Sequence, residues 1–80
     1  MTLYYRPKAL KQLEKLPTSE KKKVLRKLEQ LTHDNLGGKP LKGEFEGLRA
    51  IRAWPYRIIY EIRSEKIVIY SISHRQGAYQ

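Results

Sequence analysis

Two arginines flank a short turn-like sequence in the second half of the chain. Arg52 and Arg57 stand on either side of Trp54-Pro55, between runs of alternating apolar residues. If Trp54-Pro55 is the turn of a β-hairpin, the two arginines are direct cross-strand neighbours on one sheet face. Like charges in that relation destabilise a sheet, whereas two adjacent guanidinium groups are suited to clamping a phosphate. We therefore predict a phosphate site here; the alternative is a solvated face with incidental arginines.

The C-terminal tail adds residues of different chemistry. His74 and Arg75 are adjacent, and Tyr79 follows four residues later. An imidazole exchanges protons near neutral pH, an arginine stabilises charge that develops on a phosphate, and a tyrosine ring stacks on a base or positions a phosphate. We expect the preceding strand to deliver His74 and Arg75 to the sheet edge near the arginine pair. The alternative is that His74 merely ends a strand and that Tyr79 is disordered.

Composition limits the classes of protein that fit. The chain has 80 residues, which is one domain over 1–80, and 17 Lys+Arg against 8 Asp+Glu give a formal charge of +9. The absence of Cys excludes a disulfide scaffold, a thiolate nucleophile and a cysteine zinc site, and two His make a poor metal site. We expect no metal and no cofactor.

No apolar run has the length of a membrane helix or a signal peptide, so we expect a soluble, cytoplasmic protein. The positive charge indicates an anionic partner, which is nucleic acid, an anionic membrane surface or an acidic protein. The alternative is that the charge serves solubility alone.

The apolar pattern predicts an α+β fold in the order β-α-α-β-β-β. A β-prone start is followed by two segments of helical period, the first beginning at Pro7 and ending before Pro17, with Thr18 or Ser19 as N-cap of the second. The apolar faces comprise Ala9, Leu10, Leu13 and Leu16 in the first helix and Val24, Leu25, Leu28 and Leu31 in the second. The expected strands are 2–5, 48–53, 56–63 and 66–73, with turns at 54–55 and 64–65 and a long connection over 33–47. Two joined helices over one face of a mainly antiparallel sheet are the natural packing.

Alternation assigns most strand residues to a face of this sheet. The face under the helices is expected to hold Ile51, Ala53, Tyr56, Ile58, Tyr60 and Ile62. Arg49 falls on that face as well, near the start of its strand, where its head can emerge at the edge. The last strand is apolar at nearly every position, so either Ile67 and Ile69 or the set Val68, Tyr70 and Ile72 faces the helices. A partly apolar, basic open face indicates that something covers it.

Two segments carry a family resemblance. The sequences LKGEFEGLRAIRAWPYRIIYEI (Leu41 to Ile62) and IVIYSISHRQGAY (Ile67 to Tyr79) resemble the RelE/ParE superfamily of type II toxin–antitoxin toxins, on the RelE side. The shared features are the Leu-Lys-Gly step, Tyr-Arg before an apolar-aromatic strand, and the His-Arg-x-x-x-Tyr ending. The helical pair at the N-terminus agrees, so the resemblance covers almost the whole chain.

The resemblance implies a ribosome-dependent mRNA endonuclease that acts in the ribosomal A site without a metal. In such toxins the 2′-OH of the RNA attacks the adjacent phosphate, which leaves a 2′,3′-cyclic phosphate and a 5′-OH. A neighbouring gene usually encodes an antitoxin that wraps and neutralises the toxin. The partners expected from the resemblance are therefore an antitoxin with an acidic or amphipathic segment, the mRNA and the ribosome, with no membrane.

The resemblance also assigns roles to individual residues. Arg57 matches the family's phosphate-binding arginine, Arg52 a basic position on the preceding strand, and His74 a position that is often His in relatives. Arg75 and Tyr79 match the C-terminal arginine and tyrosine. The expected catalytic residues are thus Arg52, Arg57, His74, Arg75 and Tyr79, and the expected RNA-binding residues are Lys39, Lys42 and Arg49.

One departure from the family pattern leaves the proton acceptor open. The best-known branch has two lysines where this chain has the apolar Leu48 and Ala50. His74 is the first candidate for the acceptor, and Glu44 or Glu46 in the preceding loop come second. Two other functions stay open: a ParE-like toxin that poisons DNA gyrase, and a basic RNA-binding module without catalysis.

Overall fold

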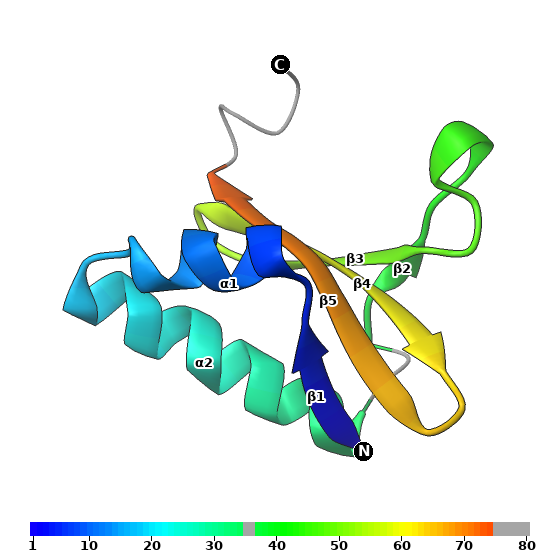
Figure 1. Cartoon of the computed structure of the whole chain (residues 1–80), viewed down its shortest axis with the longest axis horizontal. Helices are drawn as coiled ribbons and strands as arrows, with labels where there is room; N and C mark the ends of the chain where they lie inside the picture. The colour runs from blue at the N-terminus through cyan, green and yellow to red at the C-terminus, as the bar shows by residue number, and fades with distance from the viewer. Residues whose placement is uncertain (35–36, 75–80) are drawn as a thin grey trace.

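The computed structural model describes residues 1–34 and 37–74. In this part of the chain a strand comes first, then two helices, then the remaining strands (Figure 1). The elements are β1 (Thr2–Tyr5), α1 (Pro7–Glu14), α2 (Thr18–His33), β2 (Lys39–Pro40), the 3₁₀ helix η1 (Gly43–Phe45), β3 (Arg49–Ala53), β4 (Tyr56–Arg63) and β5 (Lys66–His74). The expected α+β fold is confirmed. Strand β2 and helix η1 are additions, because both lie in the connection that was expected to be a loop.

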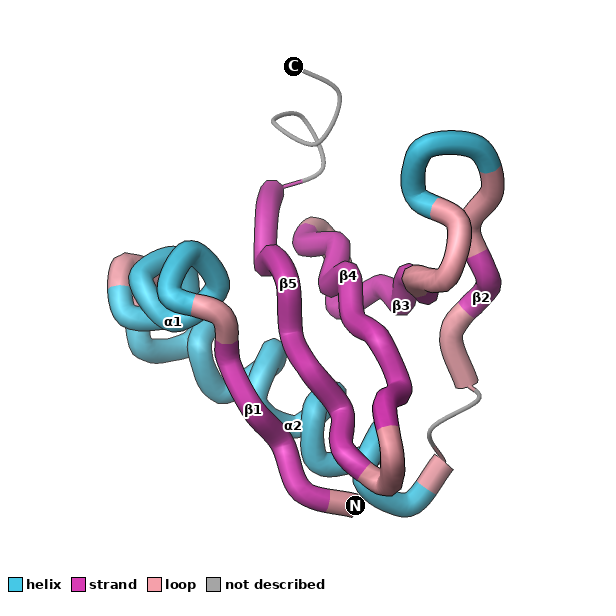
Figure 2. Tube along the Cα trace, turned by 45° about the vertical axis from the view of Figure 1, so that its right-hand side comes forward, coloured by secondary structure: helices cyan, strands magenta, loops and turns pink. Residues whose placement is uncertain are grey.

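The strands form one mixed sheet in the order β1-β5-β4-β3-β2. β1 pairs with β5 in parallel, and the other neighbours are antiparallel. Helices α1 and α2 lie on one side of this sheet (Figures 1 and 2). The opposite side, called the open face below, carries the side chains that alternate outward from the strands, among them Arg52 on β3, Arg57 and Ile59 on β4, and Ser73 on β5.

The core lies between the helices and the sheet. Its buried members are Ala9, Leu13, Val24, Leu28, Leu31, Ala53, Ile58, Tyr60, Ile67, Ile69 and Ile72, with Ile51, Tyr56 and Ile62 packed against them. The helix-facing set expected for β3 and β4 is therefore confirmed. Two leucines expected on the helices' apolar faces are exposed instead: Leu10 is 44% and Leu25 is 42% exposed. Each follows a fully buried residue, and a step of one residue turns the side chain about 100° around the helix axis.

The start of α2 differs from the expected capping. Thr18 and Ser19 lie inside the first turn, and Pro17 occupies the N-cap position without a side-chain hydrogen bond. Glu20 in the same turn accepts an ion pair from Lys23, with Nζ and Oε2 2.9 Å apart. An acidic residue near the positive end of the helix dipole stabilises the start of the helix, as a side-chain N-cap would.

Strand β5 contains a β-bulge that resolves the open question of its two faces. Ile59 pairs with Ser71, but the next residue of β4, Tyr60, pairs with Ile69, so Tyr70 is the extra residue. The bulge shifts the alternation by one position. Ile67 and Ile69 before it and Ile72 after it therefore all reach the core, and neither of the two expected sets holds along the whole strand.

Candidate functional site

Arg52 and Arg57 lie opposite each other across the β3–β4 hairpin. The register pairs Arg52 with Arg57 and Ala53 with Tyr56, which leaves Trp54 and Pro55 as the turn. On the other side of β4, Arg57 pairs with Ser73. Directly paired residues share a face, so a row of Arg52, Arg57 and Ser73 crosses the open face near the hairpin turn. The expected arginine pair is thus brought together.

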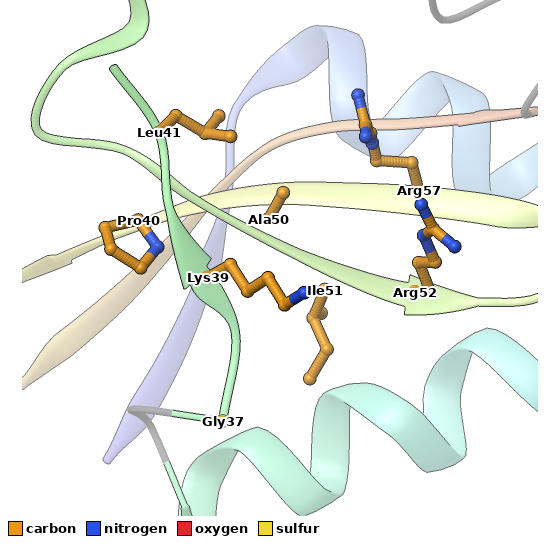
Figure 3. A pocket seen from close by; sticks show the side chains of 8 residues that line it. All are labelled: Gly37, Lys39, Pro40, Leu41, Ala50, Ile51, Arg52 and Arg57. Carbon is orange, nitrogen blue, oxygen red and sulfur yellow. The ribbon is translucent and has the colours of Figure 1, made fainter.

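A cavity of about 420 Å³ adjoins this pair. It lies beside the N-terminal end of β2, where no strand among the described residues pairs with the outer edge of β3 at Ile51 and Arg52. Figure 3 shows Arg52 and Arg57 at one end of the cavity and Lys39 extending along it from β2 toward Ile51. The lining residues are Gly37, Lys39, Pro40, Leu41, Ala50, Ile51, Arg52 and Arg57. Among the described residues that line this cavity three are cations and none is acidic, which suits it to a phosphodiester.

His74 stands at the same end of the sheet but on the other face. It pairs with Tyr56, one position nearer the turn than the pair of Arg57 and Ser73. Its ring packs edge-on against the Tyr56 ring, with centroids 5.6 Å apart. The strand therefore delivers His74 to the end of the sheet where the arginines lie, as expected, but its imidazole side chain does not join Arg52 and Arg57 on the open face.

Arg49 has a structural contact. Its Nη2 donates a hydrogen bond to the carbonyl oxygen of Gly38 at 2.6 Å, and the Gly38 N–H donates to the hydroxyl of the buried Tyr60 at 3.0 Å. Arg49 and Tyr60 are cross-strand partners, so both side chains hold the same glycine. A Cβ on Gly38 would lie 2.5 Å from the Tyr60 hydroxyl oxygen and 2.8 Å from the Ala50 carbonyl oxygen. This contact fixes β2 and Lys39 beside β3.

The remaining expected residues lie apart from the arginine pair or outside the description. Lys42, Glu44 and Glu46 are exposed in the segment around η1, and none of them lines the cavity with the arginines. Arg75 and Tyr79 lie outside the described residues. Of the expected site residues that the structure describes, Lys39, Arg52 and Arg57 are those it brings together.

A second cavity, of about 320 Å³, was not predicted from the sequence. It is lined by Arg6, Pro7, Lys8, Phe45, Leu48, Ile59, Tyr70 and Ser71. The Arg6 guanidinium lies 5.2 Å from the centroid of the Tyr70 ring, and the Tyr70 hydroxyl donates to Glu61 Oε1 at 3.0 Å. Signals for it in the sequence were weak, because Tyr70 reaches this surface through the bulge and Phe45 through the folding of the η1 segment.

The described residues also limit other chemistry. Within residues 1–34 and 37–74, no cluster of three His, Asp or Glu side chains is placed to hold a metal ion. No helix in the same ranges has the length and apolar character needed to cross a membrane. Burial raises the pKa of the Tyr5 phenol above its ordinary value of 10.0, but Tyr5 packs against the core rather than at either cavity.

The class of protein follows from comparison with known families. Residues 3–79 match the family model described as the ParE toxin of the type II toxin–antitoxin system parDE. The chain therefore belongs to this family of toxins, within the RelE/ParE superfamily. No curated protein gives a significant sequence match.

Several solved structures of toxins and toxin–antitoxin complexes are similar to this chain. A chain of the RelBE2 toxin–antitoxin complex from Mycobacterium tuberculosis is 32% identical, with a TM-score of 0.84 over 92% of this chain and 96% of that one. The YoeB/ParE toxin from Agrobacterium tumefaciens shares the fold at 15% identity, with a TM-score of 0.81 over 92% and 98%. The RelE–RelB complex from Pyrococcus horikoshii shares it at 22% identity, with a TM-score of 0.79 over 96% and 97%.

Proposed function

We propose that this toxin is an endoribonuclease that cleaves mRNA in the ribosomal A site, without a metal ion. The observation that carries the proposal is the pairing of Arg52 with Arg57 on the open face, beside Lys39 in one cavity. A pair of like charges lowers the stability of the free sheet. It therefore favours a function in which an anion lies between the two strands. The relative at 32% identity, a chain of a RelBE2 complex, supports the RelE type of activity.

The proposed reaction needs charge stabilisation and proton transfer. The 2′-oxygen of the RNA forms a bond to the adjacent phosphorus, and the bond from phosphorus to the 5′-oxygen breaks. The 2′-OH proton goes to a base, and the 5′-oxygen takes up a proton as it leaves. Arg57 and Arg52 stabilise the negative charge that grows on the non-bridging oxygens, because their guanidinium groups are already held on neighbouring strands.

His74 is the proposed proton acceptor, and its position sets a condition on the substrate. The ring lies against Tyr56 at the end of the sheet, one residue beyond the arginine row. RNA bound to the arginines must therefore pass over the hairpin end to bring a 2′-OH to the imidazole. Glu44 and Glu46, exposed around η1, are the alternative acceptors. Arg75 and Tyr79 keep their proposed roles in charge stabilisation and substrate positioning.

An antitoxin is the proposed protein partner. The family model describes toxins of type II toxin–antitoxin systems, and solved relatives carry titles of toxin–antitoxin complexes. The charge of +9 favours a partner with an acidic segment. Such a segment would compete with RNA for the basic open face and so neutralise the toxin.

The deciding experiment measures cleavage of mRNA on programmed ribosomes. Wild-type protein should cleave and leave a 2′,3′-cyclic phosphate, and Arg57→Ala should lower the rate by about 10²–10³-fold. The matched control is Arg63→Ala, which removes the same charge from the same strand at its far end. Arg63 lies 3.5 Å from Glu61, outside the arginine cavity. Equal rates for Arg57→Ala and the wild type would contradict the proposal.

A gyrase poison is the second candidate, favoured by the ParE description of the family model. A gyrase poison should trap cleaved DNA with purified gyrase and leave ribosome-bound mRNA intact. The same protein preparation can be assayed both ways. A basic RNA-binding module would do neither, and in that case Arg57→Ala would weaken RNA binding without any reaction to lose.

A further inference from the structure

The open face holds a second groove beyond the arginine pair. Its floor comprises Ile59, Tyr70 and Ser71, and its volume is about 320 Å³. One wall comes from the start of α1, where Arg6 and Lys8 lie, and the other from Phe45 in η1. Sites for small ligands begin at about this volume, so the groove has room for a group the size of one nucleotide.

The chemistry of the lining indicates an anionic ligand with a flat ring. Phe45, the chain's single phenylalanine, lines the groove and is 47% exposed, so its ring is accessible to a ligand. The Arg6 guanidinium lies over one face of the Tyr70 ring at 5.2 Å from its centroid. Lys8 adds a second cation, and none of the described residues that line the groove is acidic. An exposed ring beside cations is the combination by which proteins hold single-stranded nucleic acid.

The register relates this groove to the arginine pair. Ile59 on β4 and its partner Ser71 on β5 lie two residues from the pair of Arg57 and Ser73, on the same face. Two residues along a strand span about 6.6 Å, a distance that one nucleotide of an extended strand covers. A strand of RNA whose phosphate lies at Arg57 therefore has its neighbouring nucleotide over the groove.

We propose that this groove binds the nucleotide adjacent to the phosphate held by Arg52 and Arg57, with the base stacked on Phe45 and the phosphate against Lys8. The proposal rests on the proposed ribonuclease function and specifies which part of the substrate the second site takes. The groove thereby contributes to the choice of sequence at the position next to the cleaved bond. Arg6 stays on Tyr70 and gives the groove its fixed cationic edge.

The test uses 2′-O-methyl RNA trinucleotides, which lack the attacking 2′-OH and are not cleaved. Trp54 is the only tryptophan of the chain and lies in the turn next to the arginine pair, so its fluorescence reports binding. Phe45→Ala should weaken binding by about 5- to 150-fold, the range for loss of one base–aromatic stack, and Phe45→Tyr should restore it. Lys8→Ala should reduce the slope of log affinity against log salt by about 0.7, as expected for one lost contact to a single strand.

Tyr4→Ala is the matched control. Tyr4 is also 47% exposed and lies on edge strand β1 beside Lys66, outside the groove. It should leave both trinucleotide affinity and cleavage unchanged. Thermal unfolding of every variant shows whether the fold is intact, and Phe45→Tyr separates loss of stacking from loss of packing.

The outcomes separate this inference from the proposed function. Wild-type cleavage with Phe45→Ala indistinguishable from Tyr4→Ala would overturn the inference and leave the nuclease function standing. Trinucleotide binding that depends on Phe45 and Lys8, without any cleavage on ribosomes, would uphold the groove and overturn the nuclease function. If Phe45→Ala weakens binding of poly-glutamate but not of the trinucleotide, the groove docks an acidic polypeptide and the inference is wrong.

Discussion

Arg52 and Arg57 are direct cross-strand partners, and the β3–β4 hairpin presents both guanidinium groups on the open face of the sheet. The pair continues across β4 to Ser73, a small polar residue that pairs with Arg57. Two like charges at this spacing lower the stability of the free protein, and a bound anion reverses the sign of their contribution. The two guanidinium groups are therefore already side by side in the free protein, as the proposed phosphate site requires.

Removal of Arg52 should stabilise the free protein. Arg52→Gln should raise the free energy of unfolding by about 0.2–1 kcal/mol, the range for a cross-strand pair. Inorganic phosphate should then raise the melting temperature of the wild type more than that of the variant, because a ligand stabilises only the state that binds it. Thermal unfolding with and without phosphate measures both effects. Arg63→Gln, which removes a charge at the far end of β4, should respond to phosphate as the wild type does.

The role proposed for His74 has its own kinetic signature. General base catalysis contributes about 10²–10⁴-fold, and a protonated imidazole cannot accept the 2′-OH proton. Single-turnover cleavage by the wild type should therefore slow on acidification, whereas His74→Gln should be slower and lose this dependence. Tyr56→Phe keeps a ring beside His74 and should retain the profile. An unchanged rate in His74→Gln together with a slow Glu44→Gln or Glu46→Gln would move the base to the η1 segment.

The hairpin register and the core face of β4 could be predicted because both follow from local rules. Trp54-Pro55 sets a two-residue turn, and strict alternation then fixes the partners of Arg52 and the buried positions of Ile58 and Tyr60. The turn at Ser64-Glu65 could be predicted in the same way. Ser64 and Glu65 adopt φ angles of 46° and 64°, the positive values that a two-residue hairpin turn favours.

The bulge at Tyr70 and the site of His74 could not be predicted in this way. A bulge depends on how β5 fits between β4 on one side and β1 and α1 on the other, and no single residue type marks it. Without it, Ile72 would point away from the core. The bulge also sets the face of the β5 residues that follow it, so it determines that His74 lies on the face of Tyr56 rather than on that of Arg57.

Gly38 should tolerate no side chain, for a reason that lies in the tertiary structure. A Cβ there would stand 2.5 Å from the Tyr60 hydroxyl oxygen and 2.8 Å from the Ala50 carbonyl oxygen. Gly38→Ala should lower the free energy of unfolding by about 1–3 kcal/mol, as overpacking of a close contact does. Denaturant unfolding measures the change. Gly37→Ala is the neighbouring control, because its Cβ would meet its nearest atom, the Asp34 carbonyl oxygen, at 3.3 Å, and a loss as large as that of Gly38→Ala would contradict the prediction.

Gln12 accepts a backbone hydrogen bond from the edge of β5, beyond the end of β1. The pairing of β1 with β5 stops at Tyr5 and Ile69, and farther along β5 the Ile72 N–H donates to the Gln12 side-chain oxygen at 2.7 Å. Gln12→Leu should cost about 1–3 kcal/mol of unfolding free energy, because it leaves a partly buried donor without its acceptor. Gln12→Glu keeps an acceptor and should cost less. Hydrogen exchange of the Ile72 amide should accelerate in Gln12→Leu; an unaltered exchange rate would show that another group replaces the glutamine.

Association with the antitoxin should slow as salt rises. The excess of 17 Lys+Arg over 8 Asp+Glu gives the chain a long-range positive field, and such fields raise association rates by about 10–10³-fold at low ionic strength. At about 1 M salt the Debye length shrinks to about 3 Å, so the association rate with the antitoxin of the adjacent reading frame should fall by at least about tenfold, with a smaller change in the dissociation rate. Stopped-flow fluorescence of Trp54 measures the rate.

Removing Arg52 and Arg57 should reduce this salt dependence more than removing Lys22 and Arg26, two exposed cations of α2 on the other side of the sheet. Equal effects of the two double variants would mean that the charge acts as a whole and that the acidic segment has no preferred place on the open face.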